Sequence, residues 1–309
     1  MSIDAGRQFD ILCTGMSSID FIFAGLERMP EPAKEMLCED FICKPGGAVN
    51  TPAALSKLGA KVAFATSLGN DFAGNMVYSF LKESGIDLDA VILSDELRTS
   101  VSSVLSICDE RAFATYCAKV DINDVLSKIE EFSEKSHYIH SYIDDCLKMP
   151  IADVAYRAGA PFSVDAAWDE SIRLSDIKDI LQRCDVFFVN EVEACSITGK
   201  SGYEEAGEEL SKYARLVVIK LGANGCMLIE DNKRTLAAAV KVGEVRDTTG
   251  CGDAFAAGFL YARVVNGWPP EKSMRLGLIT GALTATFYGG VDDLFTREKV
   301  MLLYEKSLI

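Results

Sequence analysis

The sequence predicts an α/β fold in which helices cover both faces of a doubly wound, mostly parallel central sheet. Short apolar runs recur along the chain, and amphipathic stretches with helical spacing separate them. Continuous apolar runs are typical of strands that are buried on both faces. Regular alternation of such strands with helices then implies parallel neighbours joined by helical crossovers. The predicted strands are 11–14, 62–65, 138–141, 162–164, 186–189, 216–219 and 237–242.

The amphipathic stretches define the helices of this fold. In the last of them Gly277, Gly281 and Ala285 recur every four residues. This spacing indicates close helix–helix packing, because small residues let two helix backbones approach. We expect residues 1–309 to form a single domain. The predicted helices are 48–58, 71–84, 122–133, 148–158, 176–184, 202–214, 253–266 and 271–287.

Two segments interrupt the strand–helix alternation. Residues 98–118 have the pattern of an antiparallel hairpin with a polar turn at Asp109-Glu110, and residues 20–45 contain two short apolar runs around the Pro30 to Pro32 break. We predict that these segments pair into a small separate sheet. Such a sheet is a candidate lid over a site at the carboxyl ends of the main strands. The alternative is two surface hairpins with no role in function.

Composition excludes several classes of partner. Lys and Arg total 31 and Asp and Glu total 46, so the net charge is −15. This charge repels nucleic-acid backbones and anionic membranes, although it permits a local amide-lined pocket for one small anion. The ten cysteines form no CxxC pair, as expected for reduced buried thiols, and two histidines argue against a structural zinc site. No secretory or membrane-spanning apolar segment is evident, so we expect a cytoplasmic protein.

The most informative motif is Asp-Thr-Thr-Gly-Cys-Gly-Asp at 247–253, ahead of a predicted helix. Gly250 and Gly252 flank Cys251, and glycine permits the backbone angles that aim successive N–H groups in one direction. At a helix N-terminus these groups would bind a phosphate-sized anion. Asp253 would then lie beside the anion, where a carboxylate can accept the proton of an attacking hydroxyl. The alternative is a plain turn with Asp253 as a helix cap.

Two further motifs suggest a site for a polar ligand. Gly46-Gly47 lets a backbone approach a ligand closely, and Asn50 offers a donor and an acceptor to sugar hydroxyls. In isolation, a Pro-Gly-Gly turn with a polar residue in the first helical turn is the simpler explanation of this stretch. Asp20 comes just beyond the first predicted strand, where a carboxylate would point into the crevice of an α/β fold, unless it is an ordinary loop aspartate.

The remaining motifs follow the strands at 186–189 and 216–219. Asn190 and Glu193 lie three apart at a helix start, so they share one face and could orient water around a magnesium ion. A helix N-cap with an acidic first turn satisfies the same spacing. Lys220-Leu-Gly-Ala-Asn-Gly225 predicts a strand followed by a tight turn.

These five motifs occur in one chain order that resembles the ribokinase-like (PfkB) carbohydrate kinase family over nearly the whole chain. The family's two signatures are visible at Gly46-Gly47-Ala48-Val49-Asn50, continuing to Gly74, and at 247–253. The resemblance implies a ribokinase-like fold with a β-sheet lid. It also implies ATP-dependent phosphorylation of a primary hydroxyl on a small sugar. A nucleoside kinase of the same family and a non-catalytic sugar or nucleotide sensor are the alternatives.

The resemblance also implies roles for individual residues. Asp253 corresponds to the catalytic base, and the amides of Gly250, Cys251 and Gly252 to the anion hole. Mg²⁺ is expected near Glu193 through water, and K⁺ near Asp247 and Thr249 is an option, as is a homodimer formed through the lid. The substrate positions are Asp20, Gly46, Gly47 and Asn50, and the nucleotide positions are Asn190, Glu193, Lys220, Gly222, Gly225, Thr248, Thr286 and Gly289.

The sequence leaves the acceptor open. After the strand near 164 it reads Asp165-Ala-Ala-Trp168 in place of the Asp-Pro-Asn-x-Arg of some sugar kinases, and Ala48 stands where ribokinases commonly have lysine. An aromatic stack in the lid would favour a nucleoside. Phe21, Phe23, Phe41 and Phe113 are the candidates for it.

Overall fold

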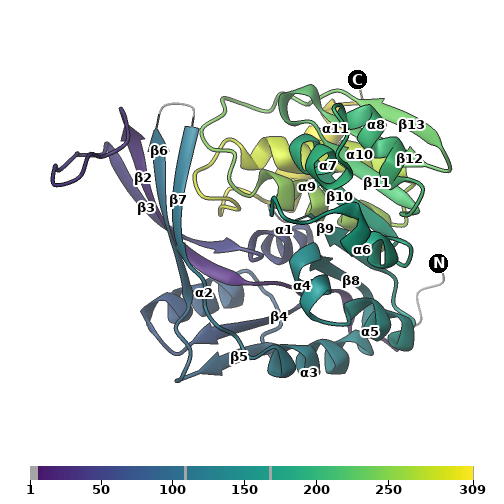
Figure 1. Cartoon of the computed structure of the whole chain (residues 1–309), viewed down its shortest axis with the longest axis horizontal. Helices are drawn as coiled ribbons and strands as arrows, with labels where there is room; N and C mark the ends of the chain where they lie inside the picture. The colour runs from purple at the N-terminus through teal and green to yellow at the C-terminus, as the bar shows by residue number, and fades with distance from the viewer. Residues whose placement is uncertain (1–5, 108–109, 167–168, 309) are drawn as a thin grey trace.

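A computed structural model describes residues 6–107, 110–166 and 169–308 and confirms the predicted α/β class (Figure 1). Its main sheet has the order β13-β12-β11-β10-β9-β8-β1-β4-β5. The strands from β11 to β5 pair in parallel, and β12 and β13 are antiparallel additions at one edge. The strands are β1 (Phe9–Thr14), β4 (Val62–Gly69), β5 (Val91–Ser94), β8 (Ser136–Tyr142), β9 (Phe162–Asp165), β10 (Val186–Asn190), β11 (Leu216–Lys220), β12 (Cys226–Glu230) and β13 (Lys233–Ala237).

The predicted strand at 237–242 is wrong, because β13 ends where that prediction begins. Ala237 pairs with Cys226, the first residue of β12, so no strand remains for later residues to pair with. Gly225, which precedes β12, packs directly against the end of β13. A Cβ on it would lie 2.0 Å from the carbonyl oxygen of Ala237. The chain then crosses to the helix that begins at residue 251 without forming a strand.

Helices cover the sheet on both faces. Ile11 and Cys13 of β1 belong to the apolar cluster that includes α1, α2, α9, α10 and α11, whereas Leu12 belongs to the cluster with α3, α5, α6, α7 and α8. The helices are α1 (Asn50–Leu58), α2 (Phe72–Glu83), α3 (Ile122–Ser133), α4 (Ile143–Lys148), α5 (Ile151–Ala158), α6 (Leu174–Leu181), α7 (Glu191–Thr198), α8 (Tyr203–Leu210), α9 (Cys251–Leu260), α10 (Pro270–Thr284) and α11 (Arg297–Lys306), with a 3₁₀ turn at Gly222–Asn224 and a π-helical turn at Tyr261–Val265.

Two of the predicted helices have informative outcomes. The one at 148–158 begins later than predicted, as α5 at Ile151, because Pro150 lacks an N–H and favours an extended conformation at the preceding residue. Lys148 instead ends α4, a short helix that was not predicted. The close packing predicted at Gly277 and Gly281 is confirmed. A Cβ on Gly277 would lie 2.9 Å from the carbonyl oxygen of Phe255, and one on Gly281 would lie 3.1 Å from that of Cys251. Helix α10 therefore packs closely along α9.

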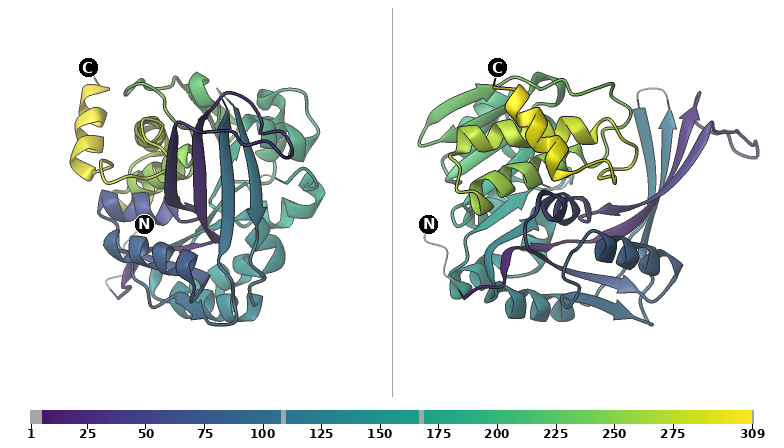
Figure 2. Two further views of the ribbon diagram at one scale, coloured as in Figure 1. Left: turned by 90° about the vertical axis from the view of Figure 1, so that its left-hand side faces the viewer. Right: turned by 180° about the vertical axis from the view of Figure 1, so that it is seen from behind.

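The two interrupting segments pair into a separate sheet of order β3-β2-β6-β7, as predicted. Asp109 of the predicted hairpin turn lies outside the described residues. The small sheet extends beyond the helices of the main body (Figure 2). Its strands are β2 (Ser17–Leu26), β3 (Asp40–Gly47), β6 (Ser100–Ile107) and β7 (Glu110–Tyr116).

The register of the small sheet separates its aromatic residues. Ile22, Val104 and Phe113 are directly paired across three strands, so they share one face. We call this the inner face, because a Cβ on Gly289 of the main body would lie 3.0 Å from Ile22 Cδ1. The side chains of Phe21 and Phe23 alternate to the outer face, where the Phe41 ring lies 6.0 Å and 5.3 Å from theirs.

Within the described residues, no helix has the length and apolar character needed to cross a bilayer.

Candidate active site

Helix α9 begins at the Gly-Cys-Gly turn, in the middle of the molecule. Its N-cap, Gly250, has φ = 70°, a left-handed conformation that favours glycine. A Cβ on Gly250 would also lie 3.0 Å from both Asn50 Cγ and Gly290 Cα. The turn is therefore wedged between the start of α1 and the segment after α10. The Cys251 N–H donates to the carbonyl oxygen of Thr248 at 3.3 Å.

Asp253 lies in the first turn of α9, but its side chain contacts other elements. The Tyr142 hydroxyl at the end of β8 donates to Asp253 Oδ1 at 2.8 Å, and Asn50 Nδ2 approaches Oδ2 at 3.5 Å. Thr51 contacts both Tyr142 and Asp253. Its hydroxyl lies 3.3 Å from the Tyr142 hydroxyl and 3.4 Å from the backbone carbonyl oxygen of Asp253. The interpretation of Asp253 as a simple helix cap is not supported by these contacts.

The electrostatics of Asp253 reflect this partly buried position. Burial raises the pKa of its carboxyl above the ordinary aspartate range, while the hydrogen bond from Tyr142, the charge of Lys220 and the contact with Asn50 oppose the rise. A carboxylate with a raised pKa is a stronger base than an exposed one.

Asp20 is carried by the small sheet and not by a loop of the main sheet. Asp20 comes just beyond β1 in the chain, as predicted, but the chain bends at Gly15 (φ = 152°) and enters β2 at Ser17, so Asp20 lies within a strand of the small sheet. Asp20 is buried, which raises the pKa of its carboxyl, and Ser18 Oγ donates to its Oδ1 at 3.0 Å. A Cβ on Gly46 would lie 2.1 Å from Asp20 Oδ2, so glycine is required there.

The two glycines of the Pro-Gly-Gly stretch end β3 and not a main strand. Gly47 has φ = 66°, and a Cβ on it would lie 2.5 Å from the carbonyl oxygen of Met16. The next helix begins at Asn50, whose Oδ1 accepts from the Val291 N–H at 3.3 Å. Through its two side-chain atoms Asn50 thus connects Asp253 with the segment after α10.

Asp247 joins the glycine turn of α9 to that same segment. Its Oδ1 accepts from the N–H and the hydroxyl of Thr249, both at 2.8 Å, and its Oδ2 accepts from the Gly289 N–H at 2.7 Å. Thr286 donates to the Leu283 carbonyl oxygen at the end of α10. The sequence motifs at 247–253 and 286–289 are therefore brought together, with Asp247 as the main connection.

Asn190 and Glu193 form a capping box at the start of α7. Asn190 Oδ1 accepts from the Glu193 N–H, and Glu193 Oε2 accepts from the Asn190 N–H, both at 2.8 Å. The helix-cap alternative is thus correct as local structure. The box uses one oxygen of each side chain, so Glu193 Oε1 lies outside it. Burial raises the pKa of the Glu193 carboxyl, and the charge of Lys220 opposes that rise.

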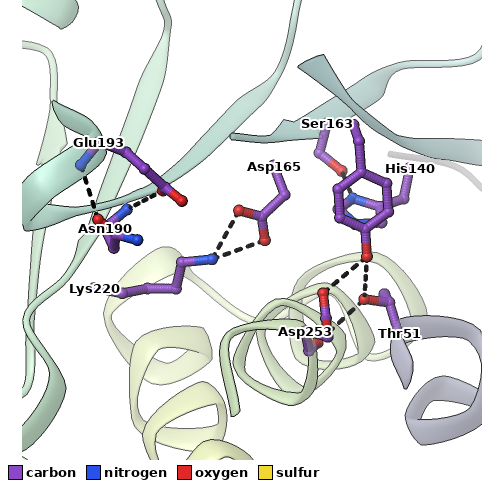
Figure 3. A network of polar contacts seen from close by, with 9 residues as sticks. Thr51, His140, Ser163, Asp165, Asn190, Glu193, Lys220 and Asp253 are labelled. Atoms are coloured by element: carbon purple, nitrogen blue, oxygen red, sulfur yellow. Dashed lines mark hydrogen bonds and ion pairs between the residues drawn. The ribbon is translucent and has the colours of Figure 1, made fainter. Parts of the chain in front are cut away.

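Lys220 ends β11 and forms an ion pair with Asp165 at the end of β9 (Figure 3). Its Nζ lies 2.7 Å and 2.8 Å from the two carboxylate oxygens. Gly222 begins a 3₁₀ turn and Gly225 follows its last residue, with φ of 56° and 98°. The predicted strand and tight turn are therefore confirmed.

The structure adds residues that the sequence interpretation missed. Tyr142 and Thr51 contact Asp253, and Asp165 holds Lys220. A usable signal existed for two of them, because Tyr142 and Asp165 directly follow the predicted strands 138–141 and 162–164. His140 is uncharged here, since burial lowers its pKa to about 3.

Comparison with known proteins identifies the family. A model of the pfkB family carbohydrate kinases matches residues 8–296. The chain belongs to this family. It is 30% identical to a fructokinase of Zea mays over 98% of this chain and 99% of the relative, and 25% identical to a nucleoside kinase of Methanocaldococcus jannaschii over 98% and 99%. It is thus a sugar or nucleoside kinase.

Solved structures of low sequence identity share the fold. An Arabidopsis thaliana ribokinase complexed with ribose and ATP superposes with a TM-score of 0.81 at 21% identity, covering 96% of this chain and 98% of that one. A putative ribokinase from E. coli in complex with ATP and Mg²⁺ gives 0.82 at 17% identity, covering 97% and 100%. The ribokinase-like fold predicted from the motifs is confirmed.

Proposed function

We propose that this family member transfers the γ-phosphoryl group of ATP to a primary hydroxyl of a small sugar, with Asp253 as the base. The observation that carries the proposal is the position of this carboxylate, in the same helical turn as the Gly250–Gly252 backbone and within reach of Asn50. A base and an anion-binding helix terminus side by side are the two parts that phosphoryl transfer to an alcohol requires.

In the proposed reaction the acceptor oxygen forms a bond to the γ-phosphorus as the bond from that phosphorus to the β,γ-bridging oxygen of ATP breaks. The hydroxyl proton passes to Asp253, and ADP leaves with the bridging oxygen. The amides at the start of α9 would stabilise the negative charge on the transferring group, aided by the helix dipole. Asp20 and Asn50 would bind other hydroxyls and orient the reacting one.

The residues present fit a magnesium ion held largely by water and phosphate oxygens. Glu193 Oε1 and the Asn190 side chain offer oxygen ligands of the hard type that Mg²⁺ prefers. The described residues contain no group of three acidic, histidine or cysteine side chains that would enclose a metal by itself. When bound, Mg²⁺ would offset phosphate charge. We keep Asp247 and Thr249 as the proposed neighbours of a monovalent cation.

The small sheet would act as a lid. Because Asp20 lies in β2, movement of this sheet would carry a substrate ligand toward or away from Asp253. Lys44 of β3 also forms an ion pair with Asp292, 2.6 Å away and just beyond the 289–291 segment. Closure around the acceptor would exclude water, which otherwise competes for the phosphoryl group.

A nucleoside acceptor is the second candidate, and one observation favours it. Phe113, which is 60% exposed, lies on the inner face beside Val104 and above the polar residues Asp20, Ser102 and Thr115. If the ribose of a nucleoside binds beside these polar residues, its base would lie beside the exposed ring of Phe113. Stacking on an aromatic ring stabilises such planar groups. The other three lid phenylalanines cannot serve, because they lie on the outer face.

The test is acceptor-dependent ADP release from MgATP, with a panel of pentoses, hexoses, 2-keto-3-deoxy sugar acids and nucleosides. Turnover with a sugar supports the first candidate and turnover with a nucleoside supports the second. In the second case Phe113→Ser should raise the KM for the nucleoside and leave the KM for ATP unchanged. Binding of sugar and nucleotide without ADP release from any acceptor would indicate a sensor and contradict the proposal.

A further inference from the structure

A buried cation at the end of β11 lies among carboxylates beside the glycine turn. The side chain of Lys220 is 16% exposed, and that of its partner Asp165 is 3% exposed. The Lys220 charge also acts on Glu193 and on Asp253. Opposing burial, Asp165 and Glu193 raise the pKa of the Lys220 ammonium, so it is charged throughout the neutral range. Figure 3 shows the Lys220 ammonium directed at the carboxylate of Asp165.

The position of Lys220 relative to the turn is closely defined. A Cβ on Gly252 would lie 3.2 Å from Lys220 Nζ, so the ammonium stands directly over the second glycine of the turn. A glycine at 252 leaves room for this ammonium. An ammonium has three N–H donors, and the two oxygens of Asp165 accept two of them. Lysine can redirect these donors by small rotations of its flexible stem.

From this arrangement we infer that Lys220 donates a hydrogen bond to the transferring phosphoryl group, and that Asp165 is the positioning residue that holds the ammonium over Gly252. The inference deepens the proposed function and rests on it. Before ATP binds, the cation faces Asp165, Glu193 and Asp253. An incoming phosphoryl group would add negative charge beside Gly252, where Lys220 is the nearest cation among the contacts described. Such stabilisation is greatest when charge builds up in the transition state.

A purely structural ion pair is the competing explanation. Lys220 and Asp165 end β11 and β9, which flank β10, so their pairing could simply join two strand ends. Removing one member of a buried pair destabilises a protein by leaving the other charge alone. That effect would appear in thermal unfolding. It would not weaken the binding of a transition-state mimic more than that of ADP.

The experiment compares Lys220→Met, which keeps an unbranched stem but removes the charge, with Lys220→Arg and with the surface control Lys212→Met. We expect Lys220→Met to lower kcat about a hundredfold to a thousandfold, the effect of losing one donor to a developing oxyanion. Inhibition by MgADP with aluminium fluoride should weaken by a similar factor, while the affinity for ADP changes less than about threefold on the same reasoning. Lys220→Arg should recover part of kcat, and Lys212→Met should match the wild type.

Asp165→Asn tests the positioning role. It should lower kcat by about tenfold, a typical effect for a group that orients a functional side chain. In the Lys220→Met background it should lower kcat no further, because its action passes through the lysine. The double variant Lys220→Met with Asp165→Asn removes both charges together. It therefore supplies a folded test protein if Lys220→Met alone is too unstable.

The outcomes separate this inference from the proposed function. If the wild type releases ADP with an acceptor but folded Lys220→Met or the double variant keeps its kcat, the role of Lys220 is refuted and the function stands. Equal weakening of ADP and of the aluminium fluoride complex would refute it as well. If the wild type shows no acceptor-dependent turnover, both ideas fail.

Discussion

The hydroxyl of Tyr142 donates a hydrogen bond of 2.8 Å to Oδ1 of Asp253, joining the end of a main-sheet strand to the first turn of α9. This bond stabilises the ionised form of a carboxylate whose pKa burial raises. Tyr142 is itself no acid near neutral pH, since burial and the neighbouring Asp253 raise the pKa of its phenol well above the ordinary value. It therefore remains a donor across the working pH range.

Tyr142→Phe should move the acidic limb of kcat/KM to higher pH. Loss of the hydrogen bond raises the pKa of Asp253 further, so on the acidic side of the profile a smaller fraction of the base is ionised than in the wild type. We expect kcat near pH 8 to fall by less than about tenfold, the scale of one hydrogen bond. The pH profile of kcat/KM measures the shift.

Tyr138→Phe is the matched control for this variant. Tyr138 lies on the same strand, but among the described residues its hydroxyl donates to Asp185, at 3.2 Å, and not to Asp253. An equal displacement of the acidic limb in Tyr138→Phe would show that the shift arises from general perturbation of β8.

Gly250→Ala should strongly lower kcat while the protein still folds. The φ of 70° costs a non-glycine residue about 1–2 kcal/mol. In addition, the new Cβ would press on Asn50 and Gly290 at 3.0 Å. We expect kcat to fall by at least about a hundredfold, because the anion-binding amides would move. The measurements are steady-state kinetics and thermal unfolding.

Gly199→Ala controls for the backbone conformation alone. Gly199 has φ = 69°, and a Cβ on it would meet nothing within 4 Å. Alanine at this position must also adopt a positive φ, so Gly199→Ala should lower the free energy of unfolding about as much as the same backbone strain does at Gly250. It should leave kcat unchanged. If Gly250→Ala retained wild-type turnover, the turn would not bind the transferring group.

Asp292→Asn should loosen the lid. It breaks the 2.6 Å ion pair between Asp292 and Lys44. Their side chains are only 30% and 23% exposed, so solvent and salt screen the attraction between the two charges only in part. We expect a larger KM for the acceptor, a smaller change in kcat and faster hydrogen exchange in β3. Asp293→Asn is the neighbouring control, because Asp293 is fully exposed and pairs with Lys57 on α1. Identical effects of the two variants would remove the ion pair from lid closure.

Lowering the pH from about 7.5 to about 5.5 should raise the free energy of unfolding through Asp145. Burial, with the nearby Asp144, raises the pKa of Asp145 to about 7, although Lys148 and Thr14 oppose the rise. The folded state therefore binds a proton at a pH where the unfolded chain does not, so stability increases as pH falls through this window and then levels off near the unfolded pKa of about 4.

Asp145→Asn should remove that part of the pH dependence. Chemical denaturation at several pH values measures it, with Asp144→Asn as the partner variant. An unchanged slope in Asp145→Asn would show that other groups cause the dependence.

The sequence allowed correct prediction of six strands of the main sheet, most helices and the separate small sheet, whereas β5 and β12 were not predicted. Continuous apolar runs such as Val186-Phe-Phe-Val189 have few alternative structures, whereas the register that pairs β2 with β6 was not predicted. The half-exposed edge strand β13 was misplaced because its residues, Lys233–Ala237, lack such a run.

Site prediction was limited where a contact depends on tertiary structure. Gly250 and Asp253 stand in a local motif, so their proximity could be predicted. The approach of Tyr142 to Asp253 spans 111 residues and depends on how β8 faces α9. Asp20 was predicted to lie just beyond the first strand, but its place inside β2 depends on the bend at Gly15, which leaves no pattern in the surrounding residues. A role for Asp165 could not be predicted from the residue type alone, because it depends on the contact with Lys220 that the fold creates.

The most direct test of the account is Asp253→Asn, assayed by acceptor-dependent ADP release and by direct binding of nucleotide and acceptor. Asparagine keeps the size of the side chain but cannot accept the proton. We predict that kcat falls by about a hundredfold or more, the scale of losing a general base, while both binding constants stay near those of the wild type. Undiminished turnover in this variant would contradict the assignment of Asp253 as the base.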